Sequence, residues 1–206
     1  RSTVLLQKEK KFLKKYKPWG VILFARNLKK FEQIKNLTND IRNIFSDKNY
    51  PILIDQEGGR VNRLNKLIET SVLTAEYFGN LFKNNKKKFF YYYKIYISQI
   101  SYLLNEIGIN INTGPVLDLR RSKSSNVIGD RSYSSLANNV SIIGDFAIKE
   151  FNKGKIGTVI KHIPGHGLAK VDSHKKTPVV TKKTNYLYKN DFLPFKKKKT
   201  FFAMTA

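Results

Sequence analysis

The chain of 206 residues gathers all three of its histidines, His162, His166 and His174, within thirteen positions. The pKa of an unperturbed imidazole lies nearest to neutrality of all side chains, so the capacity for proton transfer is concentrated in this stretch. Lys161 directly precedes the first histidine. The residues alone leave two other interpretations open, a polar loop that happens to hold three imidazoles and a structural metal clamp. The metal interpretation lacks the short helical histidine spacing of hydrolytic zinc motifs.

Polar side chains also follow each of five short apolar runs, at the points where strands would end. The runs cover residues 20–25, 51–54, 109–117, 158–160 and 201–204. The polar residues after them are Arg26 and Asn27, Asp55 to Glu57, Asp118, Lys161 with His162, and Thr205. Apolar runs without polar alternation are typical of parallel strands that are covered on both faces. A charge at the end of such a strand is costly unless it has partners or faces a site, so these side chains are candidates for a shared site.

The segments between the apolar runs have helical periodicity. Apolar residues spaced by three and four positions predict helices over residues 29–46, 86–107 and 136–152, and Gly108 is a candidate for a left-handed cap. Alternating strands and helices predict a parallel α/β sheet, either doubly wound or closed into a barrel. Polar residues at the end of every strand favour the TIM (β/α)8 barrel, because a doubly wound sheet gathers its site at one switch point. The chain also lacks the glycine-rich motifs of dinucleotide and nucleotide sites.

We expect a single domain over residues 1–206 that forms part of such a barrel. A complete barrel takes about 250 residues and eight strands, whereas five apolar runs are found here. We therefore expect the barrel to be incomplete at both ends.

The net charge of +24 invites a nucleic-acid interpretation. Much of the excess lies in lysine runs at 83–94 and 196–199, mixed with Asn, Phe and Tyr, whose codons are A/T-rich. A solvated basic surface is therefore the favoured interpretation. The chain has no cysteine, which suits a reducing compartment, and no apolar run of the roughly 18 residues that a membrane span requires. We expect a cytoplasmic monomer without a nucleic-acid or membrane partner.

Five short motifs follow one another along the chain. They are DQEGGRV at 55–61, GPVLDL at 114–119, GDRS at 129–132, KHIPGHG at 161–167 and DSH at 172–174. In this order they resemble the bacterial β-N-acetylhexosaminidases of glycoside hydrolase family 3, the NagZ type, over about residues 18–206. The resemblance implies a TIM barrel and the retaining hydrolysis of terminal β-linked N-acetylglucosamine, from muropeptides in peptidoglycan recycling. It implies no cofactor and no metal.

The resemblance also assigns residues that contact the sugar. These are Asp55, Arg63, Arg131, Lys161 and His162. A carboxylate and a planar guanidinium suit vicinal hydroxyls, because each can bridge paired donors or acceptors. An internal ion pair that shapes the rim is the alternative for Asp55 and for Arg131. We expect Glu57 and His166 to shape their loops, and Gln56 and Asp118 to be structural.

Asp172 and His174 resemble the unusual acid/base of this family, a histidine paired with an aspartate. A nearby carboxylate favours the imidazolium form and orients the ring, so the pair can protonate a departing sugar oxygen and later deprotonate water. The alternative is a surface turn with no catalytic role.

A retaining glycosidase also needs a nucleophilic carboxylate on the other face of the sugar. In the resembled family this aspartate follows a later strand, and none of the 15 acidic residues matches its motif. We expect the 206-residue polypeptide by itself to bind sugar poorly and to turn over nothing. Two other functions stay open, another family 3 β-glycosidase such as a β-glucosidase, and a non-catalytic basic module that binds carbohydrate or nucleic acid.

Overall fold

The computed structural model describes residues 2–121, 126–169, 177 and 179–206. Its main sheet has five parallel strands in the order β1-β2-β5-β6-β7. The strands are β1 (Val21–Leu23), β2 (Ile52–Ile54), β5 (Ile111–Asn112), β6 (Gly157–Ile163) and β7 (Phe202–Thr205). All five predicted apolar runs therefore overlap a strand, although β5 is much shorter than its run and β6 is longer.

The order of the strands distinguishes the two predicted architectures. Each main strand lies beside the next one along the chain, so the sheet has no point at which the strand order reverses. A doubly wound sheet requires such a reversal, whereas a TIM barrel adds its strands in sequence. The sheet is a parallel half-barrel, which confirms the predicted fold class and makes the doubly wound alternative wrong.

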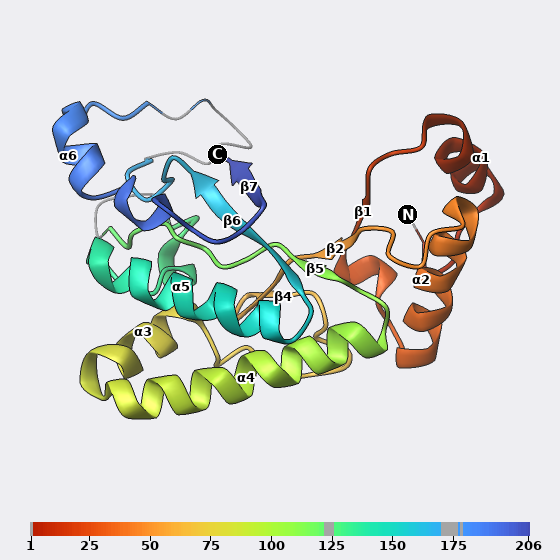
Figure 1. Cartoon of the computed structure of the whole chain (residues 1–206), viewed down its shortest axis with the longest axis horizontal. Helices are drawn as coiled ribbons and strands as arrows, with labels where there is room; N and C mark the ends of the chain where they lie inside the picture. The colour runs from red at the N-terminus through yellow and green to blue at the C-terminus, as the bar shows by residue number, and fades with distance from the viewer. Residues whose placement is uncertain (1, 122–125, 170–176, 178) are drawn as a thin grey trace.

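Three long helices connect the strands close to their predicted positions. They are α2 (Phe31–Phe45), α4 (Lys86–Glu106) and α5 (Ala137–Lys153). Figure 1 shows α4 and α5 side by side along one side of the sheet, while α2 lies near the end of the molecule that carries α1. Gly108 has a φ of 73° after α4, as predicted for a left-handed cap. A Cβ atom there would lie 2.5 Å from Thr38 Oγ1, so glycine is needed for space as well.

Several shorter elements have no counterpart in the sequence prediction. They are α1 (Gln7–Tyr16), α3 (Ala75–Asn84), α6 (Thr184–Lys189), the antiparallel hairpin of β3 (Gln56–Gly58) and β4 (Val61–Asn62), and the 3-10 turns η1 (Ala25–Asn27), η2 (Gly129–Arg131) and η3 (Leu193–Phe195). The hairpin and η2 matter most here, because they carry residues of the candidate site.

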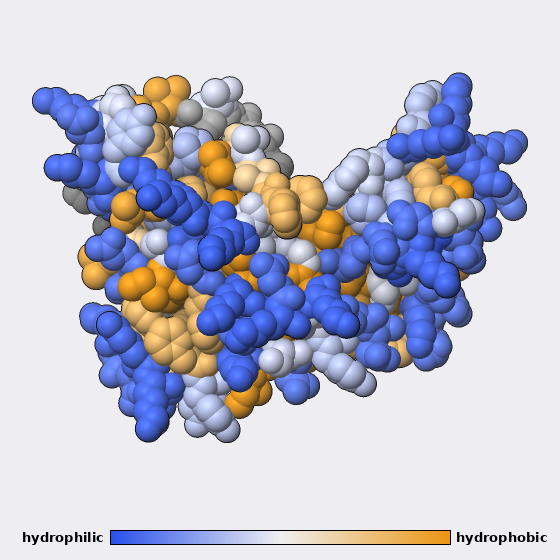
Figure 2. Space-filling model, viewed as in Figure 1, coloured by the Kyte–Doolittle hydropathy of each residue, from blue (hydrophilic) through white to orange (hydrophobic). Residues whose placement is uncertain are grey.

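One hydrophobic core joins the sheet to its helices. Ile52 and Ile54 of β2 are fully buried, as are Phe89 and Ile97 of α4. Burial of each such side chain stabilises the fold by about 1.5–3 kcal/mol. Figure 2 shows a largely hydrophilic surface that is hollowed between the part carrying β6 and β7 and the part carrying α1. Within the described ranges, no helix combines the length and the hydropathy that a membrane span requires.

Candidate functional site

A polar pocket of about 570 Å³ lies at the carboxyl ends of the strands. All five side chains predicted to contact sugar line it: Asp55, Arg63, Arg131, Lys161 and His162. They come from four separate parts of the chain, the end of β2, the segment after β4, η2 and β6. The barrel geometry brings them together, because parallel strands present their carboxyl ends at the same edge.

Lys161 lies at the centre of the ion pairs that line this pocket. It lies on β6 and its side chain is only 2% exposed. Its ammonium nitrogen lies 2.8 Å from Asp55 Oδ1 and 2.6 Å from Glu57 Oε1. Thr113 Oγ1 accepts a further hydrogen bond from Lys161, at 3.4 Å. A buried ammonium is tolerated when carboxylates surround it, so these contacts fix the position of the lysine.

Asp55 follows β2 and binds two cations. Besides Lys161, it faces Arg63, whose Nη2 lies 3.5 Å from Asp55 Oδ2. It also accepts a short hydrogen bond from the Thr113 hydroxyl. Burial by itself would raise the pKa of Asp55, but Lys161, the Thr113 hydrogen bond and Arg63 outweigh burial and lower it. Asp55 is therefore held as a carboxylate at the edge of the pocket.

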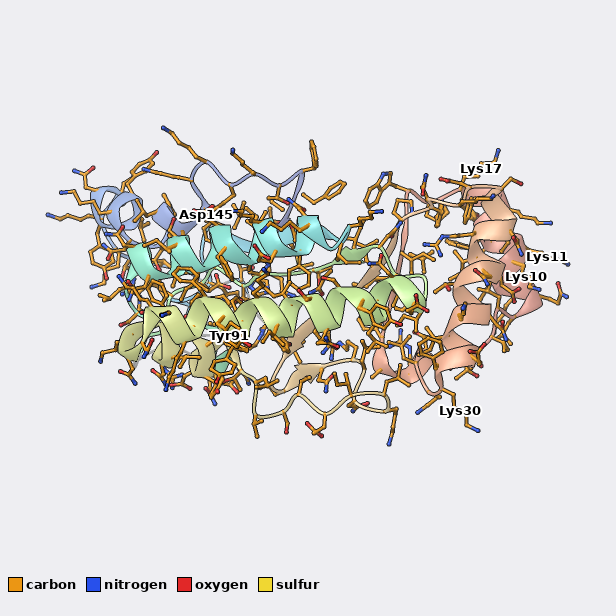
Figure 3. All side chains as sticks on the ribbon, turned by 60° about the horizontal axis from the view of Figure 1, so that its bottom comes forward. Lys10, Lys11, Lys17, Lys30, Tyr91 and Asp145 are labelled. Carbon is orange, nitrogen blue, oxygen red and sulfur yellow. The ribbon has the colours of Figure 1, made fainter. Side chains whose placement is uncertain are left out.

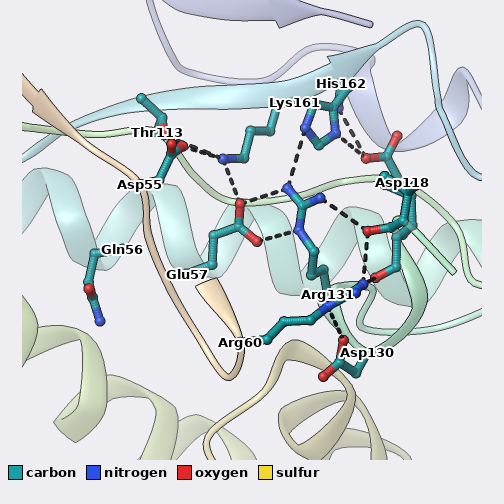
Figure 4. Close-up of polar contacts among 12 residues, drawn as sticks. Asp55, Gln56, Glu57, Arg60, Thr113, Asp118, Asp130, Arg131, Lys161 and His162 are labelled. Atoms are coloured by element: carbon teal, nitrogen blue, oxygen red, sulfur yellow. Dashed lines mark hydrogen bonds and ion pairs between the residues drawn. The ribbon is translucent and has the colours of Figure 1, made fainter. Parts of the chain in front are cut away.

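Glu57 joins the lysine to Arg131 at the floor of the pocket. Arg131 donates two parallel hydrogen bonds to this carboxylate, from Nε at 2.7 Å and from Nη2 at 2.8 Å. Burial would raise the pKa of Glu57, but Lys161 and Arg131 together lower it. Burial would likewise lower the pKa of Arg131, and the pairing with Glu57 raises it. Figure 4 shows this chain of contacts from Asp55 through Lys161 and Glu57 to Arg131.

Asp118 orients the imidazole ring of His162. Asp118 Oδ2 lies 2.6 Å from His162 Nδ1 and also accepts a hydrogen bond from the His162 backbone N–H, at 3.2 Å. Its other oxygen accepts from the backbone N–H of His166, at 2.6 Å. The carboxylate fixes the ring so that Nε2 points toward Arg131 Nη2, 3.4 Å away. His166 thus shapes the loop through its backbone, as the sequence analysis expected.

Three further residues support the loops around the pocket. Gln56 Oε1 accepts hydrogen bonds from the backbone N–H groups of Arg63 and Leu64, which ties β3 to the segment that follows β4. Arg60 pairs with Asp130 at 2.8 Å. Arg131 pairs with Glu57 and not with Asp130, its neighbour in the sequence. Arg131 thus forms an internal ion pair and also lines the pocket.

Glu57 and Asp118 are the two residues whose importance the sequence analysis missed. Both come shortly after predicted apolar runs, Glu57 after residues 51–54 and Asp118 after residues 109–117, and that position was the available signal. Asp118 was expected to be structural without a defined contact, and its carboxylate lies 2.6 Å from Nδ1 of His162. Glu57 was expected only to shape its loop, and its carboxylate forms ion pairs with both Lys161 and Arg131.

The charged groups that line the pocket are largely paired with one another. Two carboxylates, Asp55 and Glu57, contact the cationic groups of Arg63, Arg131 and Lys161, and the buried Asp118 lies against His162. Such a site offers fixed hydrogen-bond donors and acceptors without a large net field. This arrangement suits a neutral ligand that carries several hydroxyl groups.

The predicted acid/base residues Asp172 and His174 lie outside the described residues. The part of the chain that the structure describes contains no group of three or more His, Cys, Asp or Glu side chains placed to hold a metal ion. The rings of His162 and His166 have centroids 6.1 Å apart.

Several known proteins resemble this chain in sequence. Residues 3–199 match the model of the glycosyl hydrolase family 3 N terminal domain. The chain is 34% identical to Beta-hexosaminidase A of Pseudoalteromonas piscicida over 197 residues, which cover 94% of this chain and 32% of the relative. It is 32% identical to Beta-hexosaminidase of Thioalkalivibrio sulfidiphilus over 95% of this chain and 55% of the relative.

A solved structure shares the fold over the whole chain. The crystal structure of NagZ from Neisseria gonorrhoeae in complex with N-trifluoroacetyl-D-glucosamine superimposes with a TM-score of 0.85 at 28% identity. The match covers 100% of this chain and 61% of that protein. The chain thus spans between about a third and three fifths of the length of the proteins that it resembles. The single-domain organisation, the monomeric state and the cytoplasmic location stay predictions.

Proposed function

This chain belongs to glycosyl hydrolase family 3, and on that premise we propose that its polar pocket binds a terminal β-linked N-acetylglucosamine for hydrolysis. One observation carries the proposal. The five side chains that the family resemblance assigns to the sugar converge on one pocket, although they come from four separate parts of the chain. We further propose muropeptides as the substrates and peptidoglycan recycling as the process.

The size and chemistry of the pocket support a sugar ligand. Its volume of about 570 Å³ lies within the range of small-molecule sites. Asp55 and Arg63 lie side by side at its edge, so neighbouring hydroxyls of a sugar ring could donate to the carboxylate and accept from the guanidinium. The related NagZ structure contains N-trifluoroacetyl-D-glucosamine, a glucosamine that is acylated on nitrogen.

The pocket residues prearrange these groups before the sugar arrives. Glu57 holds Lys161 and Arg131 together, and Asp118 fixes the ring of His162. A prearranged polar site stabilises a bound transition state because little reorganisation is needed during the reaction. The chain's own residues therefore bind and orient the sugar from one side.

The proton transfers in this proposal belong to His174 and Asp172. His174 would protonate the departing oxygen and then deprotonate the attacking water, with Asp172 favouring the imidazolium form. Retention requires in addition a nucleophilic carboxylate on the opposite face of the sugar. We assign this role to none of the acidic residues in this chain.

The test is hydrolysis of chromogenic β-glycosides by the protein that carries this chain. We expect the N-acetylglucosaminide to be cleaved with a much higher kcat/KM than the corresponding glucoside. Arg63→Met should lower kcat/KM for the N-acetylglucosaminide by about 10- to 100-fold, since a charge-assisted hydrogen bond contributes about 1.5–3 kcal/mol. The control is Arg120→Met, which breaks a solvent-exposed pair with Glu76 outside the pocket and should change kcat/KM little.

A second variant tests the acid/base assignment. His174→Ala should abolish most hydrolysis while N-acetylglucosamine still inhibits or binds as before. Preferred cleavage of the glucoside would assign the protein to another branch of the family. An unchanged kcat/KM in Arg63→Met would contradict the proposed sugar site.

A further inference from the structure

Helix α4 presents an exposed face of tyrosines and lysines on the outer side of the half-barrel. We define the α4 face by Lys87, Lys88, Tyr91, Tyr92, Lys94 and Tyr102, all of which are exposed. The three tyrosine side chains are 63%, 51% and 66% exposed, in chain order. Large aromatic side chains with this exposure gain little from folding, so the face is available for another contact.

The side of α4 opposite to this face packs into the core, so the α4 face points away from the sheet. Phe89, Ile97, Ile100 and Leu104 are buried in the core. From Lys87 to Lys94 the exposed residues recur at intervals of three and four positions, and Tyr102 lies eight positions further on, so all of them form one stripe on the same side of the helix. Figure 3 shows α4 at the front with Tyr91 on its outer side, far from Lys11 and Lys17 of the α1 region.

The charge on this stripe has one sign. Residues 77–105 contain five lysines and neither an acidic residue nor an arginine. A long basic segment without acidic residues attracts an anionic surface, and each lysine near an anionic bilayer contributes measurably to binding.

An apolar groove lies beside the α4 face and shares Tyr92 with it. It has a volume of about 330 Å³ and runs between the segment 68–73 and α4. Ile68, Leu73, Tyr92, Ile95 and Tyr96 contribute to its walls, and Glu69 contributes one carboxylate. The α4 face therefore combines cationic groups, amphipathic aromatic rings and an apolar depression.

We propose that the α4 face binds the surface of an anionic phospholipid bilayer. Tyrosine concentrates at the boundary between headgroups and acyl chains, where its ring is apolar and its hydroxyl is hydrated. Lysine can extend its ammonium group to the phosphates while its methylene groups cover apolar surface. The protein would lie on the bilayer without crossing it.

Other partners fit the α4 face less well. Protein interfaces are depleted in lysine, which makes up half of this face. Nucleic-acid sites favour arginine and a motif or groove that follows the phosphate backbone, and the α4 face has neither. The expectation of no membrane partner considered only spanning segments, and this proposal replaces it.

The proposed contact leaves the polar pocket open. In Figure 1, α4 runs along the outside of the sheet, whereas the pocket lies at the carboxyl ends of the strands. The proposal does not rest on the proposed hydrolase function, because no residue of the α4 face lines the pocket.

The test is co-sedimentation of the protein with two kinds of vesicle. One contains equal parts of phosphatidylcholine and phosphatidylglycerol, and the other contains phosphatidylcholine alone. We expect binding to the anionic vesicles only. Substitution of Lys87, Lys88 and Lys94 by Gln should weaken binding by about 100-fold, from the contribution of three lysines near the bilayer.

A charge-matched control separates the α4 face from the overall charge. Substitution of Lys11, Lys14 and Lys17 by Gln removes the same three charges from the α1 region and should weaken binding by less than about fivefold. Substitution of Tyr91, Tyr92 and Tyr102 by Ser leaves the charge at +24 and should weaken binding by about tenfold. Unchanged circular dichroism and hydrolysis would show that each variant is folded.

Three outcomes would overturn the proposal. They are no binding to anionic vesicles, an equal loss in the two lysine variants, and tight binding of short duplex DNA that the α4 lysine variant abolishes. The last outcome would assign the α4 face to nucleic acid.

Discussion

Glu57→Gln is the substitution that most sharply tests how the pocket is held together. The carboxylate of Glu57 lies 2.6 Å from Lys161 Nζ and accepts two hydrogen bonds from Arg131 at 2.7 and 2.8 Å. Glutamine keeps one acceptor oxygen but places an NH2 group against a cation. The two cations then lose the negative charge that they share.

The magnitude follows from the burial of these groups. Removal of one partner from a buried ion pair costs about 3–5 kcal/mol, because the other charge stays buried. Lys161 keeps Asp55 as a partner, so the lower end of this range applies. We expect Glu57→Gln to lower the free energy of unfolding at neutral pH by about 3 kcal/mol. We also expect kcat/KM for the chromogenic N-acetylglucosaminide to fall by about 100-fold, because Lys161 and Arg131 lose their positions.

The pH dependence gives this prediction a definite sign. The pKa of Glu57 is lowered in the folded protein from its ordinary value of 4.5. Its stabilising effect is therefore complete above about pH 4.5 and disappears as the pH falls through the lowered pKa. The difference in unfolding free energy between the wild-type protein and Glu57→Gln should be largest near neutral pH and should shrink in acid.

The assay is equilibrium unfolding in urea, followed by circular dichroism at several pH values. The control is Glu76→Gln, because Glu76 forms a partly exposed pair with Arg120 at 2.6 Å. An exposed pair contributes about 0–1 kcal/mol, so the control should change little. A loss in Glu57→Gln no larger than that of the control, or one independent of pH, would refute the reasoning.

Three further predictions concern the core, the histidine and salt. The Tyr93 hydroxyl hydrogen-bonds the Tyr133 hydroxyl at 2.6 Å, whereas the buried Tyr96 hydroxyl has no hydrogen-bond partner among the described residues. Urea unfolding should therefore show a loss of about 1–3 kcal/mol for Tyr93→Phe and almost none for Tyr96→Phe, and equal losses would contradict this. Asp118→Asn should remove the fixed orientation of His162 and lower kcat/KM by at least about tenfold. If nitrogen NMR showed the His162 ring in the same tautomer as in the wild-type protein, and kinetics showed the same kcat/KM, this prediction would be contradicted. The KM for the N-acetylglucosaminide should change by less than about twofold between low and moderate salt, since a neutral sugar releases no counterions, whereas a steep rise would favour a phosphate-bearing ligand.

The strands and long helices could be predicted because their signals are local. The run around Ile52 is apolar without alternation, and α4 repeats its apolar residues at helical spacing. Helix α3 was missed although Thr74 begins it as a capping residue that accepts a hydrogen bond from the Tyr77 backbone N–H at 3.0 Å. Its ten residues include Gly79, which interrupts the periodicity, and Gly79 packs directly against the backbone of Tyr133.

The hairpin after β2 could not be predicted from its own residues. Gln56, Glu57 and Gly58 have neither β-branched side chains nor apolar alternation, which are the usual signals of a strand. The segment is extended because distant groups bind it. The side chain of Asn112 contacts both the backbone N–H and the carbonyl of Gln56, at 3.0 and 2.9 Å.

The membership of the site was predictable only in part, and its internal pairing was not. The motif order indicated five of the side chains that line the pocket but not Glu57, and the barrel explains why they meet. The pairing of Glu57 with Arg131 joins residues 74 positions apart, so no local pattern could indicate it. The same holds for the contact of Asp118 with His162, across 44 positions.

The central claim is that the pocket at the strand ends holds a terminal N-acetylglucosamine. A crystal structure of the protein that carries this chain, soaked with N-acetylglucosamine, tests this claim most directly. We predict a single sugar ring in the pocket, with its hydroxyls within hydrogen-bond distance of Asp55, Arg63 and Lys161. A sugar bound elsewhere, or an empty pocket at a concentration that inhibits hydrolysis, would contradict the claim.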